Sequence, residues 1–201
     1  MTAAVESDGR IRCSWADFSG PRWAADDSVL YRNYHDTEWG RPLTGSRELF
    51  ERMTLEAFQS GLSWLIILRK RENFRRAFKR FDAKKVARFG ETDIARLMAD
   101  AGIVRNRAKI EATIANARAV GELDVELGDL LWSFAPEARP RPTALTGVPA
   151  VTPESTAMAK ELKRRGFKFV GPTTAYALMQ ATGMVDDHLD SCWVPVIARG
   201  D

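Results

Sequence analysis

The chain has four residues of the types that bind zinc, namely two cysteines, Cys13 and Cys192, and two histidines, His35 and His188. Two thiolates and two imidazoles form a common closed, tetrahedral zinc site. Because His188 and Cys192 are four positions apart, a helical segment would place both side chains on one face. A zinc ion on this set would join the N-terminal segment to the C-terminal one and hold chain ends that otherwise fray.

Two other interpretations of these residues stay open. Cys13 and Cys192 can form a disulfide bond, or all four residues can be unrelated, with the cysteines packed as small apolar side chains and the histidines in local hydrogen bonds. The gap between Cys13 and His35 is longer than in a compact zinc finger. Spacing alone therefore does not decide between them.

A second candidate site is the segment GFKFVGPTTAYALMQATG at residues 166–183. It reads as a turn between two helices, the second running over about residues 173–182. The glycine of the turn lets the backbone approach a phosphate, and the free amides at the next helix start are oriented to bind it. An ordinary tight turn between packed helices explains the pattern equally well. The candidate residues for DNA-backbone binding are Lys168, Gly171, Thr173 and Thr174.

Cationic residues gather in clusters, although the net charge is only +3. Such clusters suit a phosphate backbone, and they also suit the solvated face of a helix. Charge alone therefore decides nothing. The clusters are Arg69, Lys70, Arg71, Arg75, Arg76, Lys79 and Arg80, then Arg105, Arg107 and Lys109, and then Lys163, Arg164, Arg165 and Lys168.

Amphipathic helices must position these residues, because helical periodicity recurs along the chain and strand signals do not. A helix with Ser63 as N-cap is expected to run to Phe78. Similar apolar stripes cover residues 49–58, 94–101 and 110–117. The sequence therefore predicts an all-α fold.

The chain is expected to form a single domain over residues 1–201. Five of its nine prolines lie in residues 132–153, so no helix can run through that segment. The next helix is expected to start with Thr152 as N-cap and Pro153 in its first position. The prediction is a helical block over about 27–133, an irregular connector over about 134–152, and a helix-hairpin-helix block over about 153–192 that packs with the N-terminal segment.

The chain carries no membrane signal. Its N-terminus, MTAAVESDGR, is polar, and its apolar runs reach about five residues, against the roughly 20 that span a bilayer. We expect a soluble, cytoplasmic monomer.

Five blocks span most of the chain, namely RCSWA at 12–16, YHDTEWG at 34–40, LFERMTLEAFQSGLSWLIILRKRENFR at 49–75, DAGIVRNRAKIEATIANARA at 100–119 and KRRGFKFVGPTTAYALMQATGMVDDH at 163–188. Together, and in this order, they resemble the bacterial DNA-3-methyladenine glycosylases of the constitutive type, which belong to the helix-hairpin-helix superfamily. One block alone would be a weak signal. The resemblance implies a base-excision repair enzyme that turns a nucleotide out of double-stranded DNA and hydrolyses the glycosidic bond of an alkylated adenine.

The resemblance also implies one structural zinc ion. The family binds it through a cysteine near the N-terminus, the histidine of the YHD motif and a C-terminal His-x3-Cys pair. Two features depart from the family, because this chain has extra residues at roughly 16–29 and only nine residues after the last ligand. The implied ligands are Cys13, His35, His188 and Cys192.

A base-binding pocket follows from the same resemblance, with Glu56 as its carboxylate and Trp64 as an aromatic wall, beside Tyr34, Trp39 and Trp15. N3-alkylated adenine is a cation, and an aromatic face attracts a cation by about 0.5–2 kcal/mol. A carboxylate accepts from its exocyclic amine and favours its charge. Without the resemblance, Glu56 reads equally well as a polar residue on an exposed helix face, and the tryptophans read as core.

Because the leaving base is already charged, the reaction needs no general acid, and Glu56 serves first in recognition and second as a base. Superfamily members that also cleave the backbone carry a lysine just after the hairpin glycine, where this chain has Thr173, and no lysine follows Lys168. We expect hydrolysis alone. Asp186 and Asp187 could act in the site or support the zinc ligands.

The rival interpretation is a zinc-stabilised helix-hairpin-helix module that binds DNA without excising a base. Such a module has no use for a desolvated carboxylate beside an aromatic cavity. Glu56 together with the aromatic set therefore favours the enzyme.

Overall fold

A computed structural model describes residues 4–5, 8–16 and 24–197 of the chain, and over these residues the fold is all-α, as predicted. Two-residue strands pair antiparallel near the N-terminus, and they are too short to leave an alternating pattern in the sequence. The helices are α1 (Ala25–Thr37), α2 (Ser46–Gln59), α3 (Trp64–Ala77), α4 (Ala83–Val86), α5 (Glu91–Ala99), α6 (Arg107–Gly121), α7 (Leu127–Trp132), α8 (Pro153–Arg164) and α9 (Pro172–Ala181). The short elements are β1 (Ala4–Val5), β2 (Ile11–Arg12) and the 3-10 turns η1 (Ser14–Ala16), η2 (Lys79–Phe81) and η3 (Leu145–Gly147).

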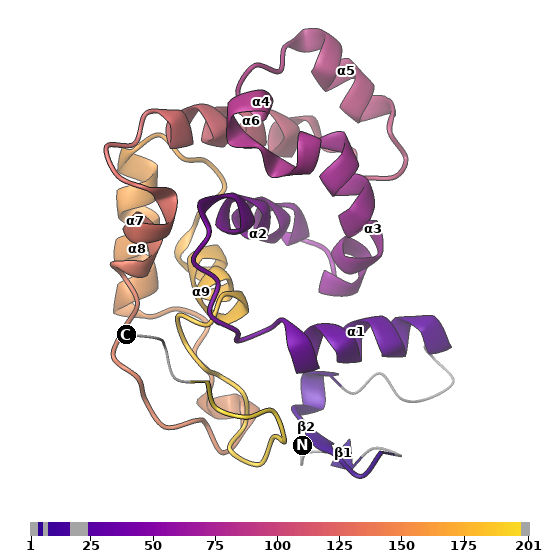
Figure 1. Cartoon of the computed structure of the whole chain (residues 1–201), viewed down its shortest axis with the longest axis vertical. Coiled ribbons are helices and arrows are strands. Elements are labelled where there is room, and N and C mark those ends of the chain that lie inside the picture. Colours follow the sequence, from indigo (N-terminus) through magenta and orange to yellow (C-terminus); the bar gives the residue numbers. More distant parts are fainter. Residues whose placement is uncertain (1–3, 6–7, 17–23, 198–201) are drawn as a thin grey trace.

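Helix α2 is the central element of the fold. Figure 1 shows it in the middle of the molecule, with α3 to α6 above and to its right, α7 and α8 to its left, and α9 below it. It packs against α3, α6, α7 and α9. Its last turns are buried nearly all round, from Met53 to Phe58, as expected for a helix surrounded by others. The position of Glu56 within this run excludes the interpretation of it as an exposed surface residue.

The predicted apolar stripes fall on helices. The stripe at 49–58 lies on α2, and the helix expected after Ser63 is α3, although the Ser63 side chain makes no cap hydrogen bond. The stripe at 94–101 is shorter than predicted, because α5 ends where Asp100 takes an extended backbone. The stripe at 110–117 lies on α6.

The connector carries only the turn η3 before α8 begins. Thr152 caps α8 as predicted, since its Oγ1 accepts from the Ser155 amide at 3.2 Å. The helix ends at Arg164, Gly166 follows with φ +87°, and the Phe167 amide then donates to the Leu162 carbonyl at 3.0 Å. Helices α8 and α9 therefore form a pair joined by a short hairpin.

The two ends of the described chain meet. The Trp193 amide donates to the Ile11 carbonyl at 2.8 Å, and Gly40, just after α1, donates to the Gln180 carbonyl at 3.1 Å. The N-terminal segment thus packs with the C-terminal block. Part of the predicted extra stretch, residues 17–23, lies outside the described residues, and α1 begins at Ala25.

None of the helices in the described part of the chain is both long and apolar enough to cross a membrane.

Candidate active site and metal centre

A cavity of about 290 Å³ opens where α1, α2, α3, α9, the connector and the segment after α9 come together. It is lined by every residue that the resemblance assigned to the pocket, namely Glu56, Trp64, Tyr34, Trp39 and Trp15. It is also lined by Tyr31, Gln59, Leu145, Val148, Ala177, Gln180 and Asp187.

Aromatic rings from three elements form the walls of the cavity. Trp15 meets Trp39 edge to face, with ring centroids 4.8 Å apart, and meets Tyr31 at 5.7 Å. Tyr34 and Trp64 have ring centroids 5.3 Å apart. Such packed rings hold one another in place, so the cavity offers preformed aromatic faces to a planar ligand.

Glu56 is the buried acid of the cavity. Its side chain lies in the buried part of α2 and lines the cavity, and the residue is 6% exposed. Burial raises the pKa of Glu56 to about 7, against the opposing effect of Arg52 one turn earlier. A buried charge without a partner costs free energy, and a ligand that supplied donors and positive charge would remove that cost.

Asp187 lines the same cavity, yet its carboxylate is fully bonded within the protein. It accepts from the Tyr176 hydroxyl at 2.6 Å, from Gln180 Nε2 at 2.9 Å and from Arg139 at 2.7 Å. Asp186 instead bonds to His188 Nδ1 at 2.8 Å. The sequence did not decide whether Asp186 and Asp187 act in the site or support the zinc ligands. In the structure Asp187 lines the cavity, whereas Asp186 supports His188.

The predicted zinc ligands meet beside this cavity. One ligand atom each from Cys13, His35 and Cys192 lies within 4.8 Å of the others, and all three residues are buried. His188 is outside this group of three, but its ring centroid is 5.1 Å from that of His35. The two cysteines are free, so the structure does not contain the alternative disulfide bond.

The donor set fits a zinc ion. His35 Nδ1 bonds to Asp36 at 2.7 Å, and its Nε2 lies 3.6 Å from Cys192 Sγ. His188 Nε2 is buried without a hydrogen-bond partner among the described residues, while its Nδ1 is held by Asp186. Carboxylates behind both rings are the usual support of metal-binding histidines. The Cys13 thiol and His35 lower the pKa of Cys192, which favours the thiolate that a metal binds.

Gly40 shows why the YHDTEWG motif ends in glycine. Its φ is +73°, and a β-carbon there would lie 2.7 Å from Cε1 of His188. Only glycine combines this backbone with this close approach. The end of α1 can therefore pack directly on a candidate zinc ligand.

The candidate phosphate-binding residues lie together on the α8–α9 hairpin. Gly171 has φ −78°, and a β-carbon there would meet nothing within 4 Å. The protein itself therefore gives no conformational or packing reason for glycine at this position. Asn116 from α6 pins the hairpin, because its side chain bonds both the amide and the carbonyl of Lys168, at 2.7 and 3.0 Å. Thr173 is exposed and Thr174 is half-buried.

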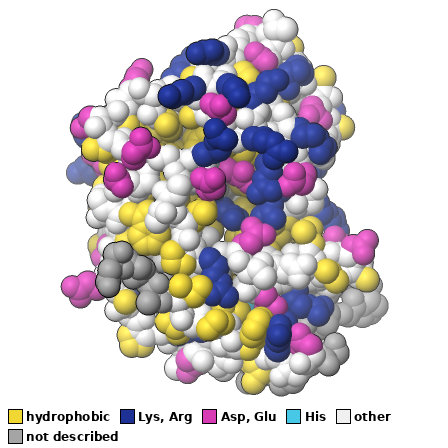
Figure 2. Space-filling model, viewed as in Figure 1, with side chains coloured by type: hydrophobic (Ala, Val, Ile, Leu, Met, Phe, Trp, Pro, Cys, Tyr) yellow, Lys and Arg dark blue, Asp and Glu magenta, His cyan; other side chains and the backbone are white. Residues whose placement is uncertain are grey.

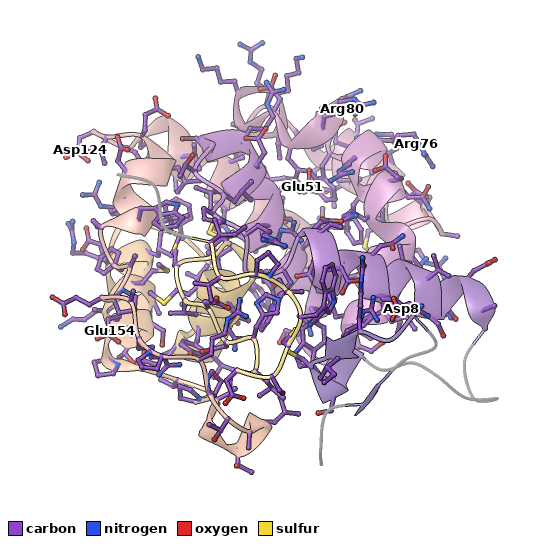
Figure 3. The ribbon with its side chains drawn as sticks, turned by 60° about the horizontal axis from the view of Figure 1, so that its bottom comes forward. Asp8, Glu51, Arg76, Arg80, Asp124 and Glu154 are labelled. Atoms are coloured by element: carbon purple, nitrogen blue, oxygen red, sulfur yellow. The ribbon has the colours of Figure 1, made fainter. Side chains whose placement is uncertain are left out.

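Several cations of these clusters form ion pairs within the protein. Figure 2 shows them interspersed with acidic side chains, and Arg107, for example, pairs with Glu91 and Glu111. Lys109 corrects the surface interpretation, because it is buried and its Nζ donates to carbonyls at the end of α2. Arg76 and Arg80 lie at the periphery in Figure 3. Pairing leaves fewer cations for phosphate than the sequence suggested.

Several cavity residues were not identified from the sequence. Tyr31 lies three positions before Tyr34 on α1, and Gln59 lies three positions after Glu56 on α2. Helical spacing from the residues already assigned could have found both. Gln180 has no such signal, because its place depends on long-range packing, and Asp187 was named from the sequence only as one of two aspartates that could act in the site.

Comparisons with known proteins agree with this geometry. The sequence model of the methyladenine glycosylase family matches residues 23–195. DNA-3-methyladenine glycosylase 1 of Escherichia coli (strain K12) is 48% identical over 176 residues, which are 85% of this chain and 93% of that protein. A crystal structure of 3-methyladenine DNA glycosylase I is similar with a TM-score of 0.83 at 44% identity, covering 90% of this chain and 98% of the other. A variant of such an enzyme in complex with 3-methyladenine has a TM-score of 0.81 at 34% identity, covering 92% and 98%.

Proposed function

This chain belongs to the methyladenine glycosylase family, and we propose that it excises 3-methyladenine from double-stranded DNA. One observation carries the proposal, the buried Glu56 carboxylate that lines an aromatic cavity. A relative of similar fold binds 3-methyladenine. The N3-methylated base brings positive charge and amine donors to this carboxylate.

Recognition and catalysis follow from the charge of the base. The cavity lies inside the protein, so the target nucleotide must leave the base stack to reach it, at a cost of a few kcal/mol. The aromatic walls and Glu56 favour the cation over neutral adenine. Water then forms a bond to the sugar C1′, the glycosidic bond breaks, and its electron pair neutralises the departing base. Glu56 can accept the proton that the water releases.

A structural zinc ion completes the proposal, bound by Cys13, His35, His188 and Cys192. When bound, it neutralises the thiolates and fixes the two imidazoles as a closed site. The histidines also support the cavity wall. The ring of His188 is 4.7 Å from that of Trp39, and the ring of His35 is 5.1 Å from that of Trp15.

The enzyme is proposed to hydrolyse only the glycosidic bond, since Thr173 occupies the place of a nucleophilic lysine. Purified protein incubated with methylated DNA should release 3-methyladenine, identified by chromatography, and borohydride should trap no covalent adduct. Release of no base would favour the non-catalytic DNA-binding module, and a stable trapped adduct would contradict hydrolysis alone.

We also propose that the α8–α9 hairpin binds the DNA backbone through the amides at the start of α9. Replacing Gly171 by valine should leave folding unchanged, because its backbone is ordinary and its surroundings are open. The added side chain would keep a phosphate away from the amides, so affinity for undamaged duplex should fall roughly tenfold, the loss of about one charge-assisted hydrogen bond.

Fluorescence anisotropy over a range of salt concentrations measures this effect. Gly121→Val is the matched control, since a β-carbon at Gly121 on α6 also meets nothing within 4 Å. Equal affinities for Gly171→Val and the control would contradict a phosphate contact at this hairpin.

A further inference from the structure

Arg52 is a buried cation directly behind the wall of the cavity. It precedes Glu56 by four residues on α2, which places both side chains on one helix face. Its guanidinium lies 5.5 Å from the ring centroid of Tyr34, a cavity residue. The Arg52 side chain is 11% exposed, and its Nη1 has no hydrogen-bond partner among the described residues.

The ion pair of Arg52 is shared with a second arginine. Glu38 accepts from Arg52 Nη2 at 3.2 Å, and it also accepts from both terminal nitrogens of Arg71, at 2.6 and 2.9 Å. One carboxylate therefore serves two guanidinium groups. Arg52 and Arg71 carry two positive charges, whereas Glu38 carries one negative charge. An ionised Glu56 therefore supplies the second negative charge that balances the two arginines.

We propose that Arg52 is a positioning residue that keeps Glu56 ionised in the empty cavity, ready to receive a cationic base. The inference rests on the proposed function of Glu56 as the base-recognising carboxylate. Arg52 acts through Glu56, because Arg52 does not itself line the cavity. It also explains why a buried arginine is tolerated next to a site for a cation, since Glu38 and Glu56 offset its charge.

The charged and titratable groups around Glu56 are consistent with this role. Burial raises its pKa to about 7, and Arg52 is the cation that opposes the rise. Tyr31 and Tyr34 on α1 stay neutral near pH 7, because burial raises both of their pKa values. Asp187 lines the cavity from the segment after α9, and it is paired with Arg139.

The pH profile of excision tests the role, because the N3-methylated nucleotide keeps its charge throughout. Ionisation of Glu56 should make kcat/KM rise through about pH 7. In Arg52→Met the pKa of Glu56 rises, so the midpoint should move up by about one unit or more, with activity at pH 7 falling about fivefold and recovering near pH 9. Arg52→Lys keeps the charge, so its midpoint should stay near that of the wild type.

Glu38→Gln is the opposite test. It removes the carboxylate that competes for Arg52, so the midpoint should move down. Carboxyl titration by NMR of the free protein, with Glu56→Gln to identify the signal, should show the pKa of Glu56 higher in Arg52→Met and lower in Glu38→Gln. This measurement does not depend on activity, so it also reports on any variant that folds but binds DNA poorly.

Three outcomes separate the possibilities. A midpoint shared by wild type, Arg52→Met and Glu38→Gln would overturn the inference and leave Arg52 a structural residue, even if Arg52→Met lowered activity at every pH. If Arg52→Met failed to fold, the Arg52→Lys and Glu38→Gln titrations would still decide. Absence of any base release by the wild type would instead reject the proposed function.

Discussion

Excision of 3-methyladenine should fall roughly 10- to 150-fold when Glu56 is replaced by glutamine. Glutamine keeps the shape and one acceptor oxygen but loses the charge, and a hydrogen bond to a charged group is worth about 1.5–3 kcal/mol. Binding of free 3-methyladenine, measured by titration, should weaken by about tenfold or more. Glu56→Ala should be worse, since it leaves the donors of the base unpaired in a partly desolvated cavity.

The same substitution should stabilise the protein at alkaline pH. The pKa of Glu56 is about 7 in the folded protein, against an ordinary value of 4.5. Stability from protonated Glu56 is therefore fully present below pH 4.5 and is lost as the pH rises through about 7. The loss amounts to about 3 kcal/mol. Glutamine stays neutral, so Glu56→Gln should be the more stable protein by up to that amount at pH 8 and should match wild type at acid pH.

Urea unfolding at pH 8 and at acid pH measures the effect of Glu56→Gln on stability, and excision assays measure its effect on activity. Glu51→Gln is the matched control on the same helix, because Glu51 pairs with Arg75 and does not line the cavity. It should leave excision unchanged. If Glu56→Gln bound the free base as tightly as wild type and excised it as fast, another carboxylate would have to serve the cavity.

Periodicity predicted the helices well, and the resemblance named five of the residues that line the cavity. The apolar stripe on α2 predicts a buried helix but not which of its polar residues faces inward, so Glu56 was assigned from the family and not from spacing. Arg52 lies on the same helix, and its role depends on Glu38 and Arg71, which are far from it in sequence. Such a charge group is created by packing and leaves no periodic pattern.

The positions of Lys109 and Asp187 also depend on packing that the sequence does not show. Lys109 belongs to a cationic run in the sequence, yet α6 packs against the end of α2 and brings its ammonium group onto buried carbonyls. Asp187 neighbours a predicted zinc ligand, yet its carboxylate lines the cavity. Adjacent residues can thus serve different sites, because an irregular backbone turns successive side chains in different directions.

Removing the proposed zinc ion should abolish both stability and excision, although none of its proposed ligands lines the cavity. In zinc-finger peptides a structural zinc contributes about 10 kcal/mol or more, comparable with the whole stability of a domain, about 5–15 kcal/mol. Its loss here would release the N-terminal segment that carries Trp15 and α1. Because the rings of His35 and His188 back Trp15 and Trp39, the aromatic wall should become disordered with them.

Elemental analysis of the wild type should give one zinc per chain, and Cys192→Ser should lose zinc, melt at a lower temperature and excise little base. Ser191→Ala, next to it on the exposed surface, is the matched control and should behave as wild type. A chelator should reproduce the defect and added zinc should reverse it, whereas a reductant should do nothing, since the cysteines are free. Sensitivity to reductant alone would point to a disulfide bond. A Cys192→Ser protein as stable and as metal-loaded as wild type would rule out the zinc site, because a tetrahedral site that loses one of its two thiolates cannot keep its affinity.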